Sequence, residues 1–229
     1  MIEVYGGQTP NVFKVLIALE ELGMKYKRVP VDITKGEQFT PEFLAISPNN
    51  RVPAIVDLEP IDGKGPLSVF ESGAILVYLT ERDPQHKLMP SDLRNRTAAM
   101  EWLMWQMAGQ GPMLGQAGHF RNYAPEKVPY GIIRYTKESA RLYGVLDKRL
   151  EGREWIAGDY SIADIACWPW IFFREQHGID LKDYPNVARW YEAFHARPAI
   201  VRAIGTEPAP KPLNLDEDAL RLLFPLKDN

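Results

Sequence analysis

Two short stretches of the chain, Val52-Pro53 and Glu71-Ser72, carry groups that could bind a small peptide. Pro53 precedes an apolar run that predicts a buried strand, and a proline, which has no N–H, belongs at the first position of a strand. There, particularly as a cis residue, it would turn the N–H and C=O of Val52 outward to pair with an extended ligand. The first stretch therefore predicts main-chain recognition of a peptide.

The second stretch follows a further apolar run and begins a pattern of helical spacing. Ser72 is predicted to be the N-cap of this helix, whose free N–H groups would hold a carboxylate. Glu71 beside it supplies a negative charge for an ammonium group. A proline before a strand and a serine at a helix start are also common structural features. Together, however, the two stretches predict a site for a peptide with a free amino-acid end.

Thr9 and Asn11 flank Pro10 in the loop between the first predicted strand and the first predicted helix. A helix-end potential, a hydroxyl and an amide N–H₂ can all stabilise a thiolate and so lower the pKa of a thiol toward ambient pH. The alternative is that Thr9 or Asn11 only caps the helix, and the same side chains can do both. The single cysteine, Cys167, lies in an apolar helix and is predicted to be a buried, inert thiol. Redox chemistry would therefore need a thiol from outside the chain.

The elements that must position these residues follow from the pattern of the first 82 residues. Apolar spacing and turn residues predict strands at 2–5, 26–31, 54–57 and 67–70, and helices at 12–22, 40–46 and 72–82. A parallel half followed by an antiparallel hairpin fits a thioredoxin-like fold, since right-handed crossovers leave few other topologies. That fold would bring the loop at Thr9 close to Pro53.

The second part of the chain predicts only helices. A linker is expected at 83–90, an all-α domain at 91–206 and a tail at 207–229. The helices are predicted at 91–109, 129–150, 161–175, 185–196 and 198–204, with a kink or an end at 109–112. Ser161 and Asp164 form a capping box with a structural role.

Composition excludes several classes of function. With 229 residues, 45% of them hydrophobic, the chain can form one large or two small domains with a substantial core. The net charge is −3 and the charge clusters are short and mixed, which argues against a nucleic-acid surface. The sequence contains no run of about 18 apolar residues, so no membrane span is expected. It shows no basic and apolar leader at its start, and a cytoplasmic protein is therefore expected. One cysteine allows neither a disulfide nor a zinc cluster, and no metal is expected.

Over nearly all of residues 1–205 the chain resembles the glutathione transferase superfamily. The Val-Pro pair, the run Phe70-Glu71-Ser72-Gly73-Ala74-Ile75 and the Ser-Ile-Ala-Asp box occur across that superfamily. More class-specific runs are Thr9-Pro10-Asn11 and Gly111-Pro112-Met113-Leu114-Gly115-Gln116. They are similar to the bacterial Nu-class, disulfide-bond-reductase-like transferases, which are related to a fungal nitrogen-regulator domain.

The resemblance implies contacts with glutathione and a reaction class. It implies the following positions: Val52 with Pro53 at the cysteinyl backbone, Glu71 and Ser72 at the γ-glutamyl end, Gln38 and Arg51 at the glycyl end, Thr9 and Asn11 beside the sulfur, and Arg134 at a second glutathione across the cleft. A solvated arginine on a helix is the alternative for Arg134. The resemblance also implies a homodimer.

The expected activity is the reduction of small disulfides, in which one bound glutathione attacks as thiolate and a second glutathione resolves the mixed disulfide. Two alternatives remain open at this point. The same thiolate could add to electrophiles or reduce hydroperoxides, or the protein could be a non-catalytic glutathione-binding regulatory module.

Overall fold

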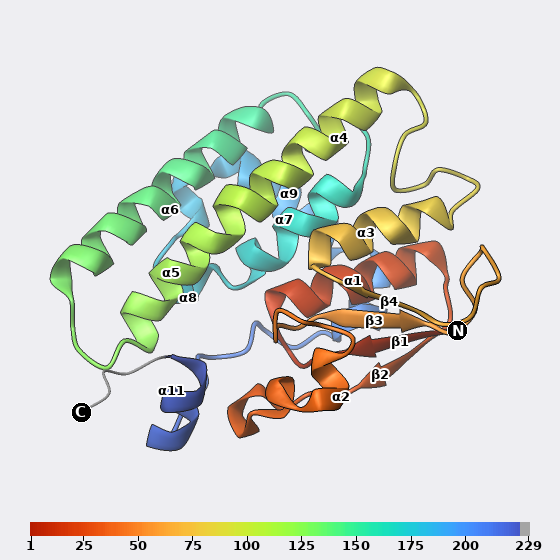
Figure 1. Cartoon of the computed structure of the whole chain (residues 1–229). Coiled ribbons are helices and arrows are strands. Elements are labelled where there is room, and N and C mark those ends of the chain that lie inside the picture. Colours follow the sequence, from red (N-terminus) through yellow and green to blue (C-terminus); the bar gives the residue numbers. More distant parts are fainter. Residues whose placement is uncertain (225–229) are drawn as a thin grey trace.

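Four short strands form one sheet in the order β2-β1-β3-β4. β1 (Ile2–Tyr5) runs parallel to β2 (Tyr26–Val29) and antiparallel to β3 (Ala54–Asp57). β4 (Leu67–Phe70) pairs with β3 as a hairpin. The computed structural model describes residues 1–224, and its sheet confirms the predicted parallel half, antiparallel hairpin and thioredoxin-like order (Figure 1).

Helices cover this sheet and connect its strands. They are α1 (Pro10–Leu22), the 3₁₀ turns η1 (Ile33–Lys35) and η2 (Glu37–Phe39), the short α2 (Pro41–Leu44) and α3 (Ser72–Glu81). Thr9 caps α1, since its Oγ1 accepts a hydrogen bond from the N–H of Val12 at 3.3 Å, and Gly23 ends the helix in the left-handed conformation. Residues 83–92 then contain no helix or strand.

The second part of the described chain is helical throughout, which confirms the predicted fold class. Its elements are α4 (Leu93–Trp105), the π-helical η3 (Gln106–Gln110), α5 (Gly111–Asn122), α6 (Pro129–Arg149), α7 (Ile162–Phe172), α8 (Arg174–His177), η4 (Leu181–Asp183), α9 (Pro185–His195), α10 (Pro198–Ile204) and α11 (Glu217–Leu223). The sequence pattern missed α5. Gly109-Gln110-Gly111-Pro112 does not end the helix, because the π turn of η3 leads directly into α5 with Pro112 in its first turn.

One hydrophobic core joins the two parts of the molecule. Residues 12–19 of α1 are all buried, and α1 packs against α3 of the sheet part and against α7 and α10 of the helical part. A single cluster of buried side chains therefore runs from Ile2 in β1 to Ala203 in α10. A polar contact also joins the two parts: Arg197 donates to both carboxylate oxygens of Glu21 on α1, at 2.6 and 3.0 Å.

A buried carboxylate organises the start of α7, as the capping box predicts. Asp164 accepts hydrogen bonds from the N–H groups of Ser161 (3.1 Å) and Ile156 (3.0 Å) and from Nε1 of Trp190 (2.9 Å). Its side chain is fully buried, and burial raises its pKa to about 6. Asp164 thus links α7 to α9 and to the loop before it.

The tail predicted at 207–229 crosses from the helical part to the sheet part. Gln176 donates to the carbonyl of Pro210 at 2.7 Å, and Phe224 packs on the ring of His119 with centroids 4.5 Å apart. α11 lies against η1, below α5 in Figure 1. Residues 225–229 of the predicted tail lie outside the described residues.

Candidate functional site

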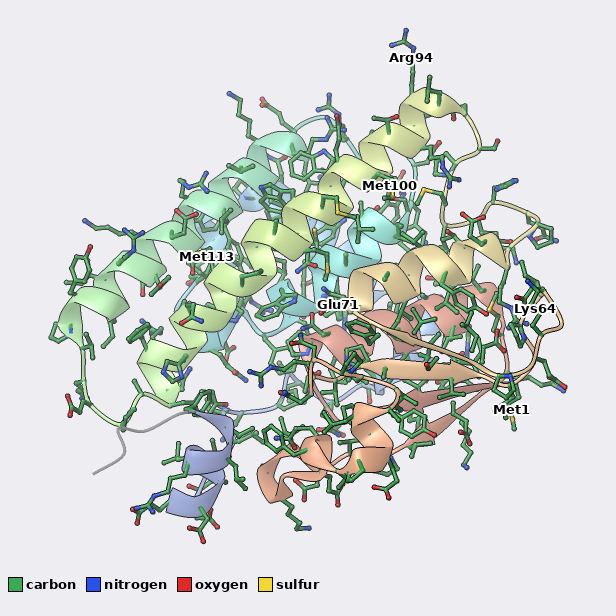
Figure 2. The ribbon with its side chains drawn as sticks, in the orientation of Figure 1. Met1, Lys64, Glu71, Arg94, Met100 and Met113 are labelled. Atoms are coloured by element: carbon green, nitrogen blue, oxygen red, sulfur yellow. The ribbon has the colours of Figure 1, made fainter. Side chains whose placement is uncertain are left out.

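A first pocket of about 180 Å³ lies where the start of α1, the entry to β3 and the start of α3 meet. It is lined by Asn11, Ser47, Arg51, Val52, Pro53, Phe70, Glu71, Ser72 and Met107. Six of the nine residues that the sequence proposed for a site are in this set. Figure 2 shows Glu71 at the beginning of α3, at the junction of the two parts of the molecule.

Val52 and Pro53 form the strand side of the first pocket. The Val52–Pro53 peptide bond is cis, and Ala54, which follows, begins β3 and pairs with Tyr5 and Phe70. Ser47 donates to the carbonyl of Arg51 at 2.8 Å and so holds the loop that leads to Val52. The backbone of Val52 therefore lies at the wall of the pocket, just before the sheet ladder begins.

The predicted N-cap at Ser72 is wrong. Glu71 occupies the cap position with a φ of 68° and makes no side-chain cap bond, and Ser72 is already the first residue of α3. A positive φ is uncommon for a residue with a side chain and costs on the order of 1 kcal/mol or more. The Ser72 hydroxyl is buried instead, where its Oγ accepts a hydrogen bond from Nζ of Lys14 at 3.2 Å. The local pattern could not show this contact, because Lys14 is 58 residues away in the sequence.

A second pocket of about 320 Å³ adjoins the first. It is lined by Asn11, Lys14, Glu71, Gln106, Met107, Gly111, Pro112, Gly115, Gln116 and Trp170. Three side chains, those of Asn11, Glu71 and Met107, line both pockets. Two ligands bound side by side would therefore share these residues.

Asn11 is held in one orientation at the boundary between the pockets. Nε1 of Trp170 donates to Oδ1 of Asn11 at 3.2 Å, so the amide N–H₂ is the end left to donate to a ligand. The Trp170 ring lies close above Gly115, where an added Cβ would meet it at 3.4 Å. Asn11 can therefore offer a positioned hydrogen-bond donor to a negatively charged sulfur.

Thr9 caps α1 without giving up its own proton. Its Oγ1 accepts from Val12, as described above, so the hydroxyl hydrogen stays available as a donor. The side chain lies two residues before Asn11, at the positive end of the 13-residue helix α1. Capping and thiolate stabilisation are therefore compatible for this residue.

Lys14 is a functional candidate that the sequence analysis missed. Its side chain is 1% exposed. Its Nζ donates to Oε1 of Gln106 at 2.6 Å as well as to Ser72, and Sδ of Met107 lies at 3.5 Å. Burial lowers the pKa of Lys14 to about 7. The available signal was a single charged residue inside the otherwise apolar run of residues 12–19.

Three predicted site residues, Thr9, Gln38 and Arg134, do not line either pocket. Gln38 is 1% exposed and its Nε2 donates to the carbonyl of Ile33 at 3.1 Å, while its Oε1 has no hydrogen-bond partner among the described residues. Arg134 lines a separate cavity of about 590 Å³ on α5 and α6, together with Met113, Tyr130 and Arg141. Gln38 and Arg134 come from η2 and α6, which contribute no residue to the two pockets that meet at Asn11.

Cys167 is fully buried on α7, and burial raises the pKa of its thiol well above the ordinary value. A thiol in this state is neither accessible nor ionised near neutral pH. Within residues 1–224 no group of acidic, histidine and cysteine side chains is arranged to hold a metal ion. Of the described helices, none combines the length and the apolar character that a membrane crossing needs.

Two family models match the chain. Residues 1–81 match the glutathione S-transferase N-terminal domain, and residues 135–198 match the glutathione S-transferase C-terminal domain. Among curated proteins, the chain is 51% identical over 205 residues to "Disulfide-bond oxidoreductase YfcG" of Escherichia coli K12, covering 89% of this chain and 94% of that protein.

Solved structures agree with this match. A glutathione transferase family member from Pseudomonas fluorescens, crystallised with two glutathione molecules bound, superposes with a TM-score of 0.83 at 44% identity, over 88% of this chain and 91% of that one. A glutathione transferase from Pseudomonas putida, with one glutathione disulfide bound per subunit, gives a TM-score of 0.82 at 41% identity, over 88% and 90% of the two chains.

Proposed function

The chain belongs to the glutathione transferase superfamily, and from this membership and its two adjoining pockets we propose that it is a glutathione-dependent enzyme that reduces small disulfides. The observation that carries the proposal is the meeting of both pockets at the oriented amide of Asn11. A relative of this chain is named a disulfide-bond oxidoreductase, and structural neighbours hold two glutathione molecules or one glutathione disulfide.

In this proposal the first pocket holds glutathione in an extended form. The backbone of Val52 pairs with the cysteinyl residue as an added strand would. The γ-glutamyl ammonium lies near Glu71, and its carboxylate lies near Ser72 and the first N–H groups of α3. The sulfur then faces Asn11 and Thr9, while the exposed guanidinium of Arg51 faces the glycyl end. Gln38 supports that end only if the η1–η2 turns open its buried amide.

The second pocket accommodates the disulfide substrate and then a second glutathione. The first glutathione thiolate attacks one substrate sulfur, so that a mixed disulfide forms and one substrate thiolate leaves. The thiolate of the second glutathione then attacks the glutathione sulfur of the mixed disulfide. Glutathione disulfide forms and the second substrate thiolate leaves, so one disulfide and two glutathione molecules give two thiols and one glutathione disulfide. The protein supplies positioning and thiolate stabilisation and no sulfur of its own.

The direct test is a comparison of two assays together with a crystal soak. Turnover of 2-hydroxyethyl disulfide with glutathione should greatly exceed conjugation of an aromatic halide, and glutathione disulfide in a soaked crystal should span both pockets with its sulfurs beside Asn11. Fast conjugation with negligible disulfide turnover would instead assign the chain to electrophile chemistry. Tight glutathione binding without either reaction would assign it to a regulatory role.

Cys167→Ala is expected to leave disulfide turnover within about twofold of the unmodified protein, because a buried and protonated thiol takes no part in exchange. The measurement is the same disulfide assay, with thermal unfolding as a control for the loss of one buried sulfur. A loss of activity in a variant that remains folded would mean that the protein uses its own cysteine, contrary to the proposal.

We also propose a homodimer that works in the cytoplasm, where glutathione is abundant and mostly reduced. The surface beside Arg134 carries the exposed side chains of Tyr130 and Ile133, which are 73% and 55% accessible. Apolar side chains gathered in this way favour a contact surface. The contact of Arg134 with a second glutathione remains a prediction of the family resemblance.

A further inference from the structure

Lys14 lies in the wall between the two pockets. Lys14 lines the second pocket, and Ser72, whose hydroxyl accepts a hydrogen bond from Lys14, lines the first. Glu71, which precedes Ser72, lines both. A buried lysine is costly to keep charged, because it leaves water for an apolar environment. Lys14 has no carboxylate within hydrogen-bond distance among the described residues, so its position needs another explanation.

We propose that Lys14 is the positioning residue that charges the γ-glutamyl carboxylate subsite through Ser72, and that it takes up a proton from solvent when this carboxylate binds. The proposal rests on the proposed function, since it assumes that glutathione occupies the first pocket. It assigns to Lys14 an effect on the ligand that is transmitted by one intervening hydroxyl.

The hydrogen-bond roles of the Ser72 hydroxyl explain this coupling. A hydroxyl has one proton to donate and can accept two bonds. When Lys14 is an ammonium, it donates to Oγ of Ser72, and the hydroxyl proton, which points to Sδ of Met107 at 3.6 Å in the absence of ligand, can turn to the ligand carboxylate. When Lys14 is a neutral amine, its lone pair competes for the same proton. A bound carboxylate therefore favours the ammonium both through this relay and through direct Coulomb attraction.

The charges around Lys14 are few. Glu71, at the start of α3, favours the ammonium. η3 presents the neutral side chains of Gln106 and Met107, and α7 presents the neutral thiol of Cys167. At the far end of α1 the acidic residues are paired, Glu20 with Arg202 and Glu21 with Arg197. Asp164 on α7 is occupied by its own donors, as described above.

Burial outweighs the attraction of Glu71 and lowers the pKa of Lys14 to about 7. In the ligand-free protein at pH 7 the amine is then about half protonated, and it becomes mostly neutral at pH 8. Binding that requires the ammonium must draw the missing proton from solvent, so affinity should fall as the pH rises above 7.

The test measures binding of S-methylglutathione by calorimetry at pH 6, 7 and 8. This probe has no ionisable thiol, so titration of the sulfur cannot contribute. Linkage predicts affinity about tenfold weaker at pH 8 than at pH 6, and uptake of about half a proton at pH 7, seen as a dependence of the binding heat on the ionisation enthalpy of the buffer.

Two comparisons isolate Lys14 and its ligand group. In Lys14→Met the affinity should be weak and independent of pH, whereas Lys25→Met, which removes an exposed lysine, should keep the pH dependence. The second comparison uses unmodified protein with the S-methyl form of 4-aminobutyryl-cysteinylglycine, which lacks only the γ-glutamyl α-carboxylate. Binding of this analogue should be independent of pH. Because this comparison uses the unmodified protein, it can be made even if Lys14→Met does not fold.

The outcomes separate this inference from the proposed function. If S-methylglutathione does not bind at any pH, the proposed function itself fails. If it binds with equal affinity at pH 6 and pH 8 and without proton uptake, the role of Lys14 is refuted while glutathione binding stands. Proton uptake that persists with the analogue lacking the carboxylate would also refute the role of Lys14, because a different ligand group would then be causing the uptake.

Discussion

Asn11→Ala is expected to lower the turnover of a small disulfide about 100- to 1,000-fold, the range found when one positioned donor to an anionic centre is removed. Trp170 donates to the amide oxygen of Asn11 and so fixes its N–H₂ as the end that can donate to a ligand. No reorganisation of this amide is therefore needed when the thiolate forms. Without this donor the pKa of the bound glutathione thiol should rise, and less thiolate should be present at neutral pH. The measurements are turnover and the ultraviolet absorbance of the thiolate as a function of pH.

Two further variants sharpen the Asn11 prediction. Asn11→Asp is nearly the same size and still accepts from Trp170, but it places a negative charge beside the sulfur, so the thiol pKa should rise further than in the alanine variant. Thr9→Val should show a smaller loss of turnover together with a helix-cap penalty of about 1 kcal/mol. Thiol titration curves that coincide with those of the unmodified protein would exclude Asn11 from the mechanism.

Asp164→Ala is expected to lower the free energy of unfolding by about 3–5 kcal/mol, because it leaves buried donors without their shared acceptor. The donors are two backbone N–H groups, the hydroxyl of Ser161 and the indole of Trp190, on three separate segments. For a chain of this size the midpoint of thermal unfolding should fall by about 10 °C. Chemical denaturation and calorimetry measure both quantities, and a loss below about 1 kcal/mol would show that water replaces the carboxylate.

The pH dependence gives this prediction a matched control in Asp164→Asn. Burial raises the folded pKa of Asp164 to about 6, above the unfolded value of about 3.9. The folded state therefore binds the proton more tightly, and the stability contributed by this group is complete below pH 4 and is lost as the pH rises through 6. Since asparagine does not ionise, the stability gap between Asp164→Asn and the unmodified protein should narrow between pH 4 and pH 7. A constant gap would place the titration elsewhere.

The strands and most helices could be predicted because they depend on local patterns. The alternation in residues 2–5, the apolar spacing after Pro10 and the proline before β3 are features that neighbours in the sequence determine. The same is true of the cap at Thr9 and the capping box at Ser161. These features also located most of the first pocket, since the end of β1, the entry to β3 and the starts of α1 and α3 meet in this fold.

The errors involve contacts between distant segments. The local pattern predicts Ser72 as a helix cap, because it cannot show that the partner of this hydroxyl is Lys14 on another helix. Lys14 itself was overlooked, because helical spacing cannot show that a charged residue on α1 is enclosed by α3, η3 and α7. Gln38 lies on a short 3₁₀ turn whose orientation is set by tertiary packing, and its amide is buried where family resemblance expected a ligand contact.

The buried apolar seam along α1 has a consequence for how substrates enter. Helices α7 and α10 share one continuous hydrophobic core with the sheet part. A hinge motion that separated the two parts would therefore expose a large apolar surface to water in every catalytic cycle. We therefore expect reactants to enter and leave without a hinge motion between the two parts. The hydrogen bond between the indole of Trp170 and the amide of Asn11 is then expected to persist from one turnover to the next.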